Sequence, residues 1–218
     1  MNDNHVSRFF VKSDSYSKNF IFELPDSWWS RVYEYNWVSS FAEQNDICLD
    51  AACGISHPLK FYLSEKCQET HACDLDERIL SESLIKQGII DDLGKENFDS
   101  LEKKNPEWFK KISFSMDSIT KLEYEDKKFD KIFCVSVLEH LLLEDLYRTL
   151  KEFKRVMKDD GLIIMTFDYP LINLEYFSWF LKQLNLKFLA EQKTELPENA
   201  IYSEELFLYC YRALIVKS

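Results

Sequence analysis

Short apolar runs alternate with segments that carry apolar residues at helical spacing along most of this chain. Buried strands are predicted at residues 46–50, 70–74, 112–116, 129–136 and 162–167. Helices are predicted at residues 58–65, 76–87, 138–157 and 175–184. Strands that alternate with helices imply βαβ units with right-handed crossovers. With a closing pair of strands at 187–191 and 206–217, the pattern predicts an α/β fold with one doubly wound, mainly parallel, seven-stranded sheet.

Glycine is scarce, so each glycine is expected to mark a backbone requirement. The chain has four glycines. Gly88 is predicted to end the helix at 76–87, and Gly161 to take the left-handed conformation in a turn before the fifth strand. The charge-dense stretch at 91–111 is interpreted as a solvated helix or an extended connection.

The first 44 residues differ from the rest because they are rich in aromatic side chains. We expect residues 1–44 to form a helical extension that covers a core domain at residues 45–218. Ser27 is predicted to cap a helix in which Trp28, Val32 and Tyr35 share one face.

Charge and cysteine content narrow the possible functions. The chain has 27 Lys and Arg against 38 Asp and Glu, a net charge of −11, which disfavours binding to nucleic acid or to anionic membranes. No stretch approaches the roughly 18 apolar residues of a membrane span. The six cysteines are scattered without a C-x-x-C pair, which predicts a cytoplasmic protein with reduced, buried thiols and no metal.

Polar residues follow every predicted strand, and in parallel sheets ligands bind at that edge. Asp50 follows the first strand, and Asp74 lies 24 positions later, where a carboxylate can accept both hydroxyls of a ribose. Asp76 is predicted to cap the next helix instead. Asp117 follows the third strand and can contact an adenine edge, although a turn role is the alternative. His140 and Asp168 follow the fourth and fifth strands.

Taken together, these segments resemble the class I S-adenosylmethionine-dependent methyltransferase family over about residues 45–170. The matching segments are LDAACGIS, ACDLD, SMDSI and FDKIFCVSVLEHL…EFKRVMKDDGLIIMTF. By this resemblance the cofactor contacts are Asp50, Ala51, Ala52, Cys53 and Gly54 beside the methionine moiety, Asp74 and Leu75 at the ribose, Asp117, Ser118 and Ile119 at the adenine, and Ser136 and Val137 near the transferred methyl group.

The loop departs from the family pattern at two glycine positions. Ala52 and Ser56 stand where glycine is usual, and alanine fits the first position if its backbone angles are ordinary. A dinucleotide-binding loop would need glycine at positions 52 and 57, where the chain has Ala52 and His57.

The resemblance implies methyl transfer from S-adenosylmethionine to a small organic acceptor by direct in-line displacement, without a metal. Arg31 is a candidate clamp for the cofactor carboxylate, with a surface ion pair as the alternative. His140 or Asp168 is predicted to deprotonate or orient the acceptor. Aromatic residues before position 45, the segment 171–180 and the region near Tyr202 are expected to form the acceptor pocket. The alternatives are a noncatalytic nucleotide-binding or scaffold subunit and an NAD-dependent oxidoreductase.

Overall fold

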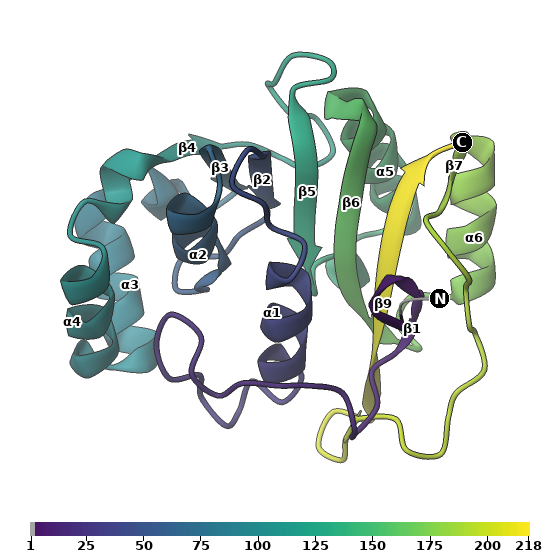
Figure 1. Cartoon of the computed structure of the whole chain (residues 1–218), viewed down its shortest axis with the longest axis horizontal. Helices are drawn as coiled ribbons and strands as arrows, with labels where there is room; N and C mark the ends of the chain where they lie inside the picture. The colour runs from purple at the N-terminus through teal and green to yellow at the C-terminus, as the bar shows by residue number, and fades with distance from the viewer. Residues whose placement is uncertain (1–2) are drawn as a thin grey trace.

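The computed structural model describes residues 3–218 and contains one sheet flanked by helices (Figure 1). Seven strands lie in the order β1 (Arg8–Phe9), β9 (Leu208–Lys217), β6 (Met157–Tyr169), β5 (Phe129–Val135), β2 (Ile47–Ala51), β3 (Glu69–Asp74) and β4 (Ile112–Met116). The strands from β6 to β4 are parallel, whereas β9 is antiparallel to β6. Two short strands, β7 (Leu186–Phe188) and β8 (Tyr202–Ser203), also pair with β9. The predicted doubly wound, mainly parallel sheet is confirmed.

Helices cover both faces of this sheet. The α-helices are α1 (Arg31–Ser39), α2 (Leu59–Lys66), α3 (Glu82–Leu93), α4 (Lys95–Lys104), α5 (Leu143–Val156) and α6 (Leu174–Gln183). The 3-10 helices are η1 (Asp3–His5), η2 (Glu77–Leu80), η3 (Trp108–Lys111) and η4 (Leu138–His140). Buried residues of α1 to α4 form one apolar cluster, and those of α5 and α6 form another. Because successive strand residues face opposite sides, Cys48 packs in the first cluster and Leu49 in the second.

Two glycines play roles other than those predicted. The helix does not end at Gly88, since α3 runs from Glu82 to Leu93 and is preceded by η2. A Cβ on Gly88 would lie 2.6 Å from Cγ2 of Ile55, so glycine permits close packing there. Gly161 is not a left-handed turn residue, because β6 passes through it. Its Cβ would lie 2.5 Å from Cγ of Met157 and 3.0 Å from the Asp130 carbonyl oxygen, so the tight spacing of β5 and β6 requires glycine.

The N-terminal part of the chain is less helical than predicted. Helix α1 begins at Arg31, and Ser30 rather than Ser27 precedes it. Trp28 lies outside the helix, where its ring stacks on His57 with a centroid separation of 4.4 Å. Residues Arg8–Phe9 form β1, an edge strand of the sheet, so this part of the chain is continuous with the main fold. The division at residues 44 and 45 stays a prediction.

The chain reverses its direction of winding between β2 and β5. From β2 it proceeds outward to β3 and β4, then returns to add β5 on the other side of β2. In open α/β sheets, ligands bind outside the carboxyl ends of the strands at such a switch point. Figure 1 shows α1 beside this region of the sheet. No helix within residues 3–218 is both long enough and apolar enough to cross a membrane.

Candidate active site

A cavity of about 100 Å³ opens at the carboxyl ends of β2 and β5, at the switch point. Its lining residues are Arg31, Tyr35, Asp50, Ala52, Cys53, Gly54, His57, Leu59, Val135, Ser136 and Val137. Seven of these belong to the predicted cofactor contacts: Arg31, Asp50, Ala52, Cys53, Gly54, Ser136 and Val137. Segments more than 100 positions apart in the chain therefore meet around one small space.

The loop after β2 has an unusual backbone. Ala52 has a φ of 53° and Gly54 a φ of 61°, both in the left-handed region. The condition that Ala52 has ordinary backbone angles is therefore wrong, because the turn needs a conformation that favours glycine. At Gly54 a Cβ would lie 2.5 Å from the ring of His57, so this position accommodates no side chain without a shift of the ring.

Backbone hydrogen bonds bring the three predicted acidic positions to one edge. Gly54 donates its N–H to Oδ2 of Asp74 at 2.8 Å. The N–H of Asp117 donates to the carbonyl oxygen of Asp74 at 3.1 Å. Asp50 and Asp74 lie in the neighbouring parallel strands β2 and β3. Asp76 accepts the Arg78 N–H at 3.0 Å, which confirms it as the predicted cap, here of η2.

Lys60, which the sequence interpretation missed, holds the loop after β2 in place by hydrogen bonds. Its ammonium is buried and donates hydrogen bonds to the carbonyl oxygens of Gly54 at 2.7 Å and His57 at 2.6 Å. Burial lowers the pKa of Lys60, whereas the charge of Asp50 opposes this effect. A lysine within the apolar positions of a short helix was the only signal in the sequence, and spacing could not reveal its partners.

Asp50 is buried and incompletely bonded. Only 3% of the residue is exposed, and within residues 3–218 its Oδ2 atom has no hydrogen-bond partner. Burial raises its pKa to about 7, with Lys60 opposing the shift and Asp74 adding to it. A buried oxygen without a partner is costly, and a ligand that donates a hydrogen bond would remove this cost.

Arg31 forms an ion pair with the buried carboxylate of Glu34 and also lines the cavity. Its Nη1 atom donates to Oε1 of Glu34 at 2.7 Å and to Oγ of Ser136 at 2.6 Å. Glu34 is fully buried, and its Oε2 accepts hydrogen bonds from Ser136 at 2.9 Å and Thr166 at 2.7 Å. Burial acts to raise the pKa of Glu34, but the Arg31 charge and these hydrogen bonds outweigh it and lower the pKa. The ion pair named as the alternative role of Arg31 is therefore present, but it joins a fully buried carboxylate to a guanidinium side chain that is 19% exposed.

Two further carboxyl groups lie next to this network, at the ends of β5 and β6. Neither oxygen of Glu139, nor Oδ1 of Asp168, has a hydrogen-bond partner in another residue of the described chain. Burial raises the pKa of Glu139 to about 8, with the charges of Asp168 and Glu34 adding to the shift. Burial and the charge of Glu34 raise the pKa of Asp168 to about 6. Glu139 was missed as a site residue, whereas its neighbour His140 is exposed.

His57 and Tyr35 also line the cavity, and Trp28 packs against His57. The Nδ1 atom of His57 lies 2.6 Å from the Tyr35 hydroxyl oxygen, and Trp28 stacks on the imidazole ring. Burial, together with the positive charges of Arg31 and Lys60, lowers the pKa of His57 to about 3. The imidazole is therefore neutral near pH 7 and adds no charge to the cavity.

Some predicted contacts lie outside the cavity. Ala51 and Ile119 are buried in the apolar cluster that contains α5 and α6. Leu75 is 72% exposed beside Asp74. Ser118 is partly buried, and its Oγ lies 2.8 Å from Oγ1 of Thr120. The contacts predicted for ribose and adenine thus lie outside the cavity, and their assignment stays a prediction.

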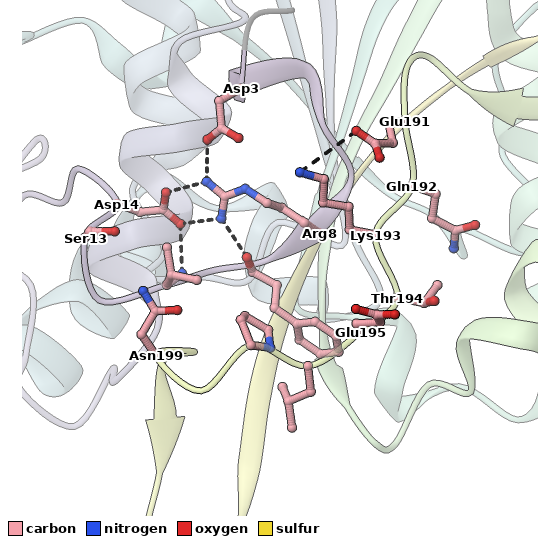
Figure 2. Close-up of a pocket in the computed structure, with 14 residues that line it drawn as sticks. Asp3, Arg8, Ser13, Asp14, Glu191, Gln192, Lys193, Thr194, Glu195 and Asn199 are labelled. Atoms are coloured by element: carbon pink, nitrogen blue, oxygen red, sulfur yellow. Dashed lines mark hydrogen bonds and ion pairs between the residues drawn. The ribbon is translucent and has the colours of Figure 1, made fainter.

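A larger cavity, of about 940 Å³, lies elsewhere, between β1 and the segment at 191–199. Figure 2 shows that its central cation, Arg8, is already engaged: it binds both carboxylate oxygens of Asp14 and also Asp3 and the Phe9 carbonyl oxygen. The predicted site residues do not line it. We therefore place the candidate active site at the smaller cavity, where the chemistry-bearing residues converge.

Comparison with known protein families found a match. The family described as a methyltransferase domain matches residues 49–165, which is more than half of the chain. This range contains the loop after β2 and the ends of β3, β4 and β5. Comparison with curated proteins found no significant match.

Solved structures with the same fold share little sequence. A TehB-like SAM-dependent methyltransferase from Corynebacterium glutamicum is 16% identical, with 85% of this chain and 87% of that chain covered and a TM-score of 0.56. The 1,6-didemethyltoxoflavin-N1-methyltransferase of Burkholderia thailandensis, with bound 1,6-didemethyltoxoflavin and S-adenosylhomocysteine, is 12% identical, with coverages of 88% and 82% and a TM-score of 0.57. The [4+2]-cyclase SpnF is 12% identical, with coverages of 95% and 87% and a TM-score of 0.62.

The residues present fit the cofactor of this family. Asp50 lines the cavity with a buried oxygen that has no hydrogen-bond partner within residues 3–218, and the loop beside it carries only small side chains from Ala52 to Gly54. Together with the match over more than half of its length, this shows that the chain belongs to the class I S-adenosylmethionine-dependent methyltransferases.

Proposed function

We propose that this protein methylates a small organic acceptor, with the cofactor held at the cavity between β2 and β5. The observation that carries this proposal is the convergence of Arg31, the loop after β2 and Ser136 on that cavity. When bound, S-adenosylmethionine supplies a methyl group on a sulfonium centre, which is open to direct in-line displacement.

In this proposal, different groups of residues bind different parts of the cofactor. We assign Asp50 and the loop Ala51 to Gly54, with Ser136 and Val137, to the methionine end. Arg31 retains donor capacity beside its Glu34 pair and faces the same cavity, which suits it to a carboxylate. We assign Asp74 with Leu75 to the ribose, and Asp117 with Ser118 and Ile119 to the adenine.

Acceptor handling belongs, in this proposal, to the carboxyl groups at the ends of β5 and β6. Asp168 has a pKa raised to about 6, so near pH 7 it is mainly ionised and able to take a proton. Glu139, with its pKa raised to about 8, is mainly protonated and able to donate a hydrogen bond. Such a pair of groups with separated pKa values suits proton transfer and orientation. His140, exposed on η4, is the alternative proton acceptor.

A ligand panel tests the cofactor assignment. Thermal unfolding is measured with S-adenosylhomocysteine, NAD and adenosine, each at 100 times the dissociation constant expected for a true ligand. S-adenosylhomocysteine should stabilise the protein by about 2.7 kcal/mol, or roughly 5–10 °C. Asp50→Asn should reduce this shift, whereas the control Asp160→Asn, on the exposed surface, should retain it. A shift with NAD alone would contradict the proposal.

One set of experiments tests both the molecule that accepts the methyl group and the residue that removes its proton. Mass spectrometry of the protein incubated with cofactor and small molecules from a cell extract should show one compound gain a methyl group. With that compound, Asp168→Asn should slow single-turnover transfer by about 10²- to 10⁴-fold if Asp168 removes a proton, and His140→Ala should change it little. The opposite ranking would assign the role to His140. Binding without transfer to any acceptor would favour the noncatalytic alternative.

A further inference from the structure

Two thiols are in contact near the amino end of the central strand β2, whereas the cofactor cavity lies at its carboxyl end. Cys48 is the second residue of β2, and Cys67 directly follows the last residue of α2. Their Sγ atoms are 3.3 Å apart, with Cys48 as hydrogen-bond donor. All six cysteines are free, and this is the only thiol–thiol hydrogen bond found within residues 3–218.

The two thiols differ in their access to solvent. Cys48 is fully buried, whereas Cys67 is partly exposed. Cys67 lies in an extended conformation, with φ of −99° and ψ of 164°, between the end of α2 and the start of β3. A small reagent can reach Cys67 first, and the buried partner is already in place beside it.

Little movement separates this pair from a covalent bond. A disulfide needs an Sγ–Sγ distance of about 2.05 Å, so the two sulfur atoms must approach by roughly 1.2 Å. A short link between a helix end and a strand can supply this movement without displacing the core. The remaining cysteines, Cys53, Cys73, Cys134 and Cys210, are buried.

We propose that Cys48 and Cys67 form a reversible disulfide when the protein meets a peroxide. In the first step the Cys67 thiolate attacks one oxygen of hydrogen peroxide, which breaks the O–O bond, gives a sulfenic acid and, after protonation of the leaving hydroxide, releases water. In the second step the sulfur of Cys48 attacks the sulfenic sulfur, the S–S bond forms, and the hydroxyl leaves with the Cys48 proton as a second water. A dithiol reductant restores both thiols.

The disulfide would close a ring formed by residues 48–67. This ring contains the whole cofactor loop, from Ala52 to His57, and all of α2. The crosslink would therefore reduce the freedom of the unfolded chain in the segment that carries the loop.

The alternative is that Cys48 and Cys67 bind a metal ion. The carboxylate of Asp46 lies with both sulfur atoms in a group whose ligand atoms are within 4.8 Å of one another. However, its Oδ2 already accepts the Glu43 N–H at 2.7 Å and pairs with the Lys131 ammonium at 2.8 Å. Three protein ligands beside a lysine charge are a poor match to a closed tetrahedral site, which needs four. The geometry therefore favours the disulfide.

Peptide mapping of the intact protein tests the proposal. The protein is treated with hydrogen peroxide, free thiols are blocked, and the digest is examined by mass spectrometry. We expect a crosslinked peptide pair joining Cys48 to Cys67, a loss of two hydrogen atoms in mass, and full reversal by dithiothreitol. The oxidised form should melt roughly 5–10 °C higher than the reduced form.

Matched variants separate this pair from the other thiols. Cys48→Ser and Cys67→Ser should each abolish the crosslink and the shift in melting temperature, whereas Cys210→Ser should preserve both. Three results would overturn the proposal: unchanged thiols in the wild type, oxidation of Cys67 to a sulfinic acid without a crosslink, or an oxidised form that melts lower. Stoichiometric zinc on the purified protein, together with peroxide-resistant thiols, would also overturn it in favour of a metal site.

Discussion

Ala52 has a side chain at a backbone position that favours glycine. Its φ of 53° costs a Cβ-bearing residue roughly 1–2 kcal/mol. Ala52→Gly should therefore stabilise the protein, although the greater freedom of glycine in the unfolded chain offsets about 0.4–1 kcal/mol. We expect a net gain of about 0.5–1 kcal/mol, measured by chemical denaturation, with the binding of S-adenosylhomocysteine unchanged or tighter.

The neighbouring residue provides the control for this substitution. Ala51 is fully buried within β2 and does not have a positive φ. Ala51→Gly should destabilise the protein by about 1 kcal/mol, because glycine in a strand interior only adds flexibility and removes packing. If both substitutions destabilised the protein equally, backbone strain at Ala52 would not be the cause.

At the scale of elements, the contact between α3 and the loop after β2 depends on the absence of a side chain at Gly88. Alanine normally stabilises a helix interior relative to glycine by about 1 kcal/mol. At Gly88, however, the new Cβ would lie 2.6 Å from Cγ2 of Ile55, a branched side chain that is stiff at χ1. Gly88→Ala should therefore destabilise the protein by about 1–2 kcal/mol in equilibrium unfolding.

A double-mutant cycle isolates that contact. Ile55→Ala removes Cγ2 and by itself costs stability through the cavity that it leaves. In that background Gly88→Ala should become neutral or stabilising, with a coupling free energy of about 1–3 kcal/mol. Strictly additive effects would show that the packing of α3 on the loop does not depend on glycine.

At the scale of the whole molecule, buried carboxyl groups at the cofactor edge make stability depend on pH. The pKa of Glu139 is raised from 4.5 to about 8 in the folded protein. A raised pKa means that the folded state holds a proton that the unfolded state has lost. The contribution to stability is therefore complete below about pH 4.5 and lost as the pH rises to about 8.

Glu139→Gln should remove the part of this dependence that Glu139 contributes, because glutamine is always neutral, whereas Asp50 and Asp168 keep theirs. The variant and the wild type should be equally stable near pH 4.5, and the variant should be more stable at pH 9 by on the order of 2 kcal/mol, since residual solvent screens part of the shift. Thermal unfolding from pH 4.5 to pH 9 measures the difference. The exposed Glu205→Gln should show no such trend, and a constant difference for Glu139→Gln would refute the assignment.

Local pattern determined the order of the central strands and the helices between them, and the acidic residues at the strand ends, but not the edge strand β1 or the short strand β8. The predicted strands at 70–74 and 112–116 match β3 and β4 closely, and Asp76 is a cap as expected. Positions such as Asp50 and Asp74 could be assigned to one edge because parallel strands present their carboxyl ends together. The apolar positions of strands and helices repeat every two to four residues, so these elements can be recognised from the sequence alone.

The atoms that particular side chains contact could not be deduced in this way. The sequence contains Lys60, Glu34 and Glu139. Only the tertiary structure, however, places the Lys60 ammonium on the loop carbonyls and leaves the carboxyl oxygens of Glu139 buried with no hydrogen-bond partner among residues 3–218. The same is true of the Gly88 contact with Ile55 and of the thiol pair Cys48 and Cys67. Hydrophobic periodicity specifies which face of an element is buried, whereas the identity of the atoms that meet there depends on how the elements pack in three dimensions.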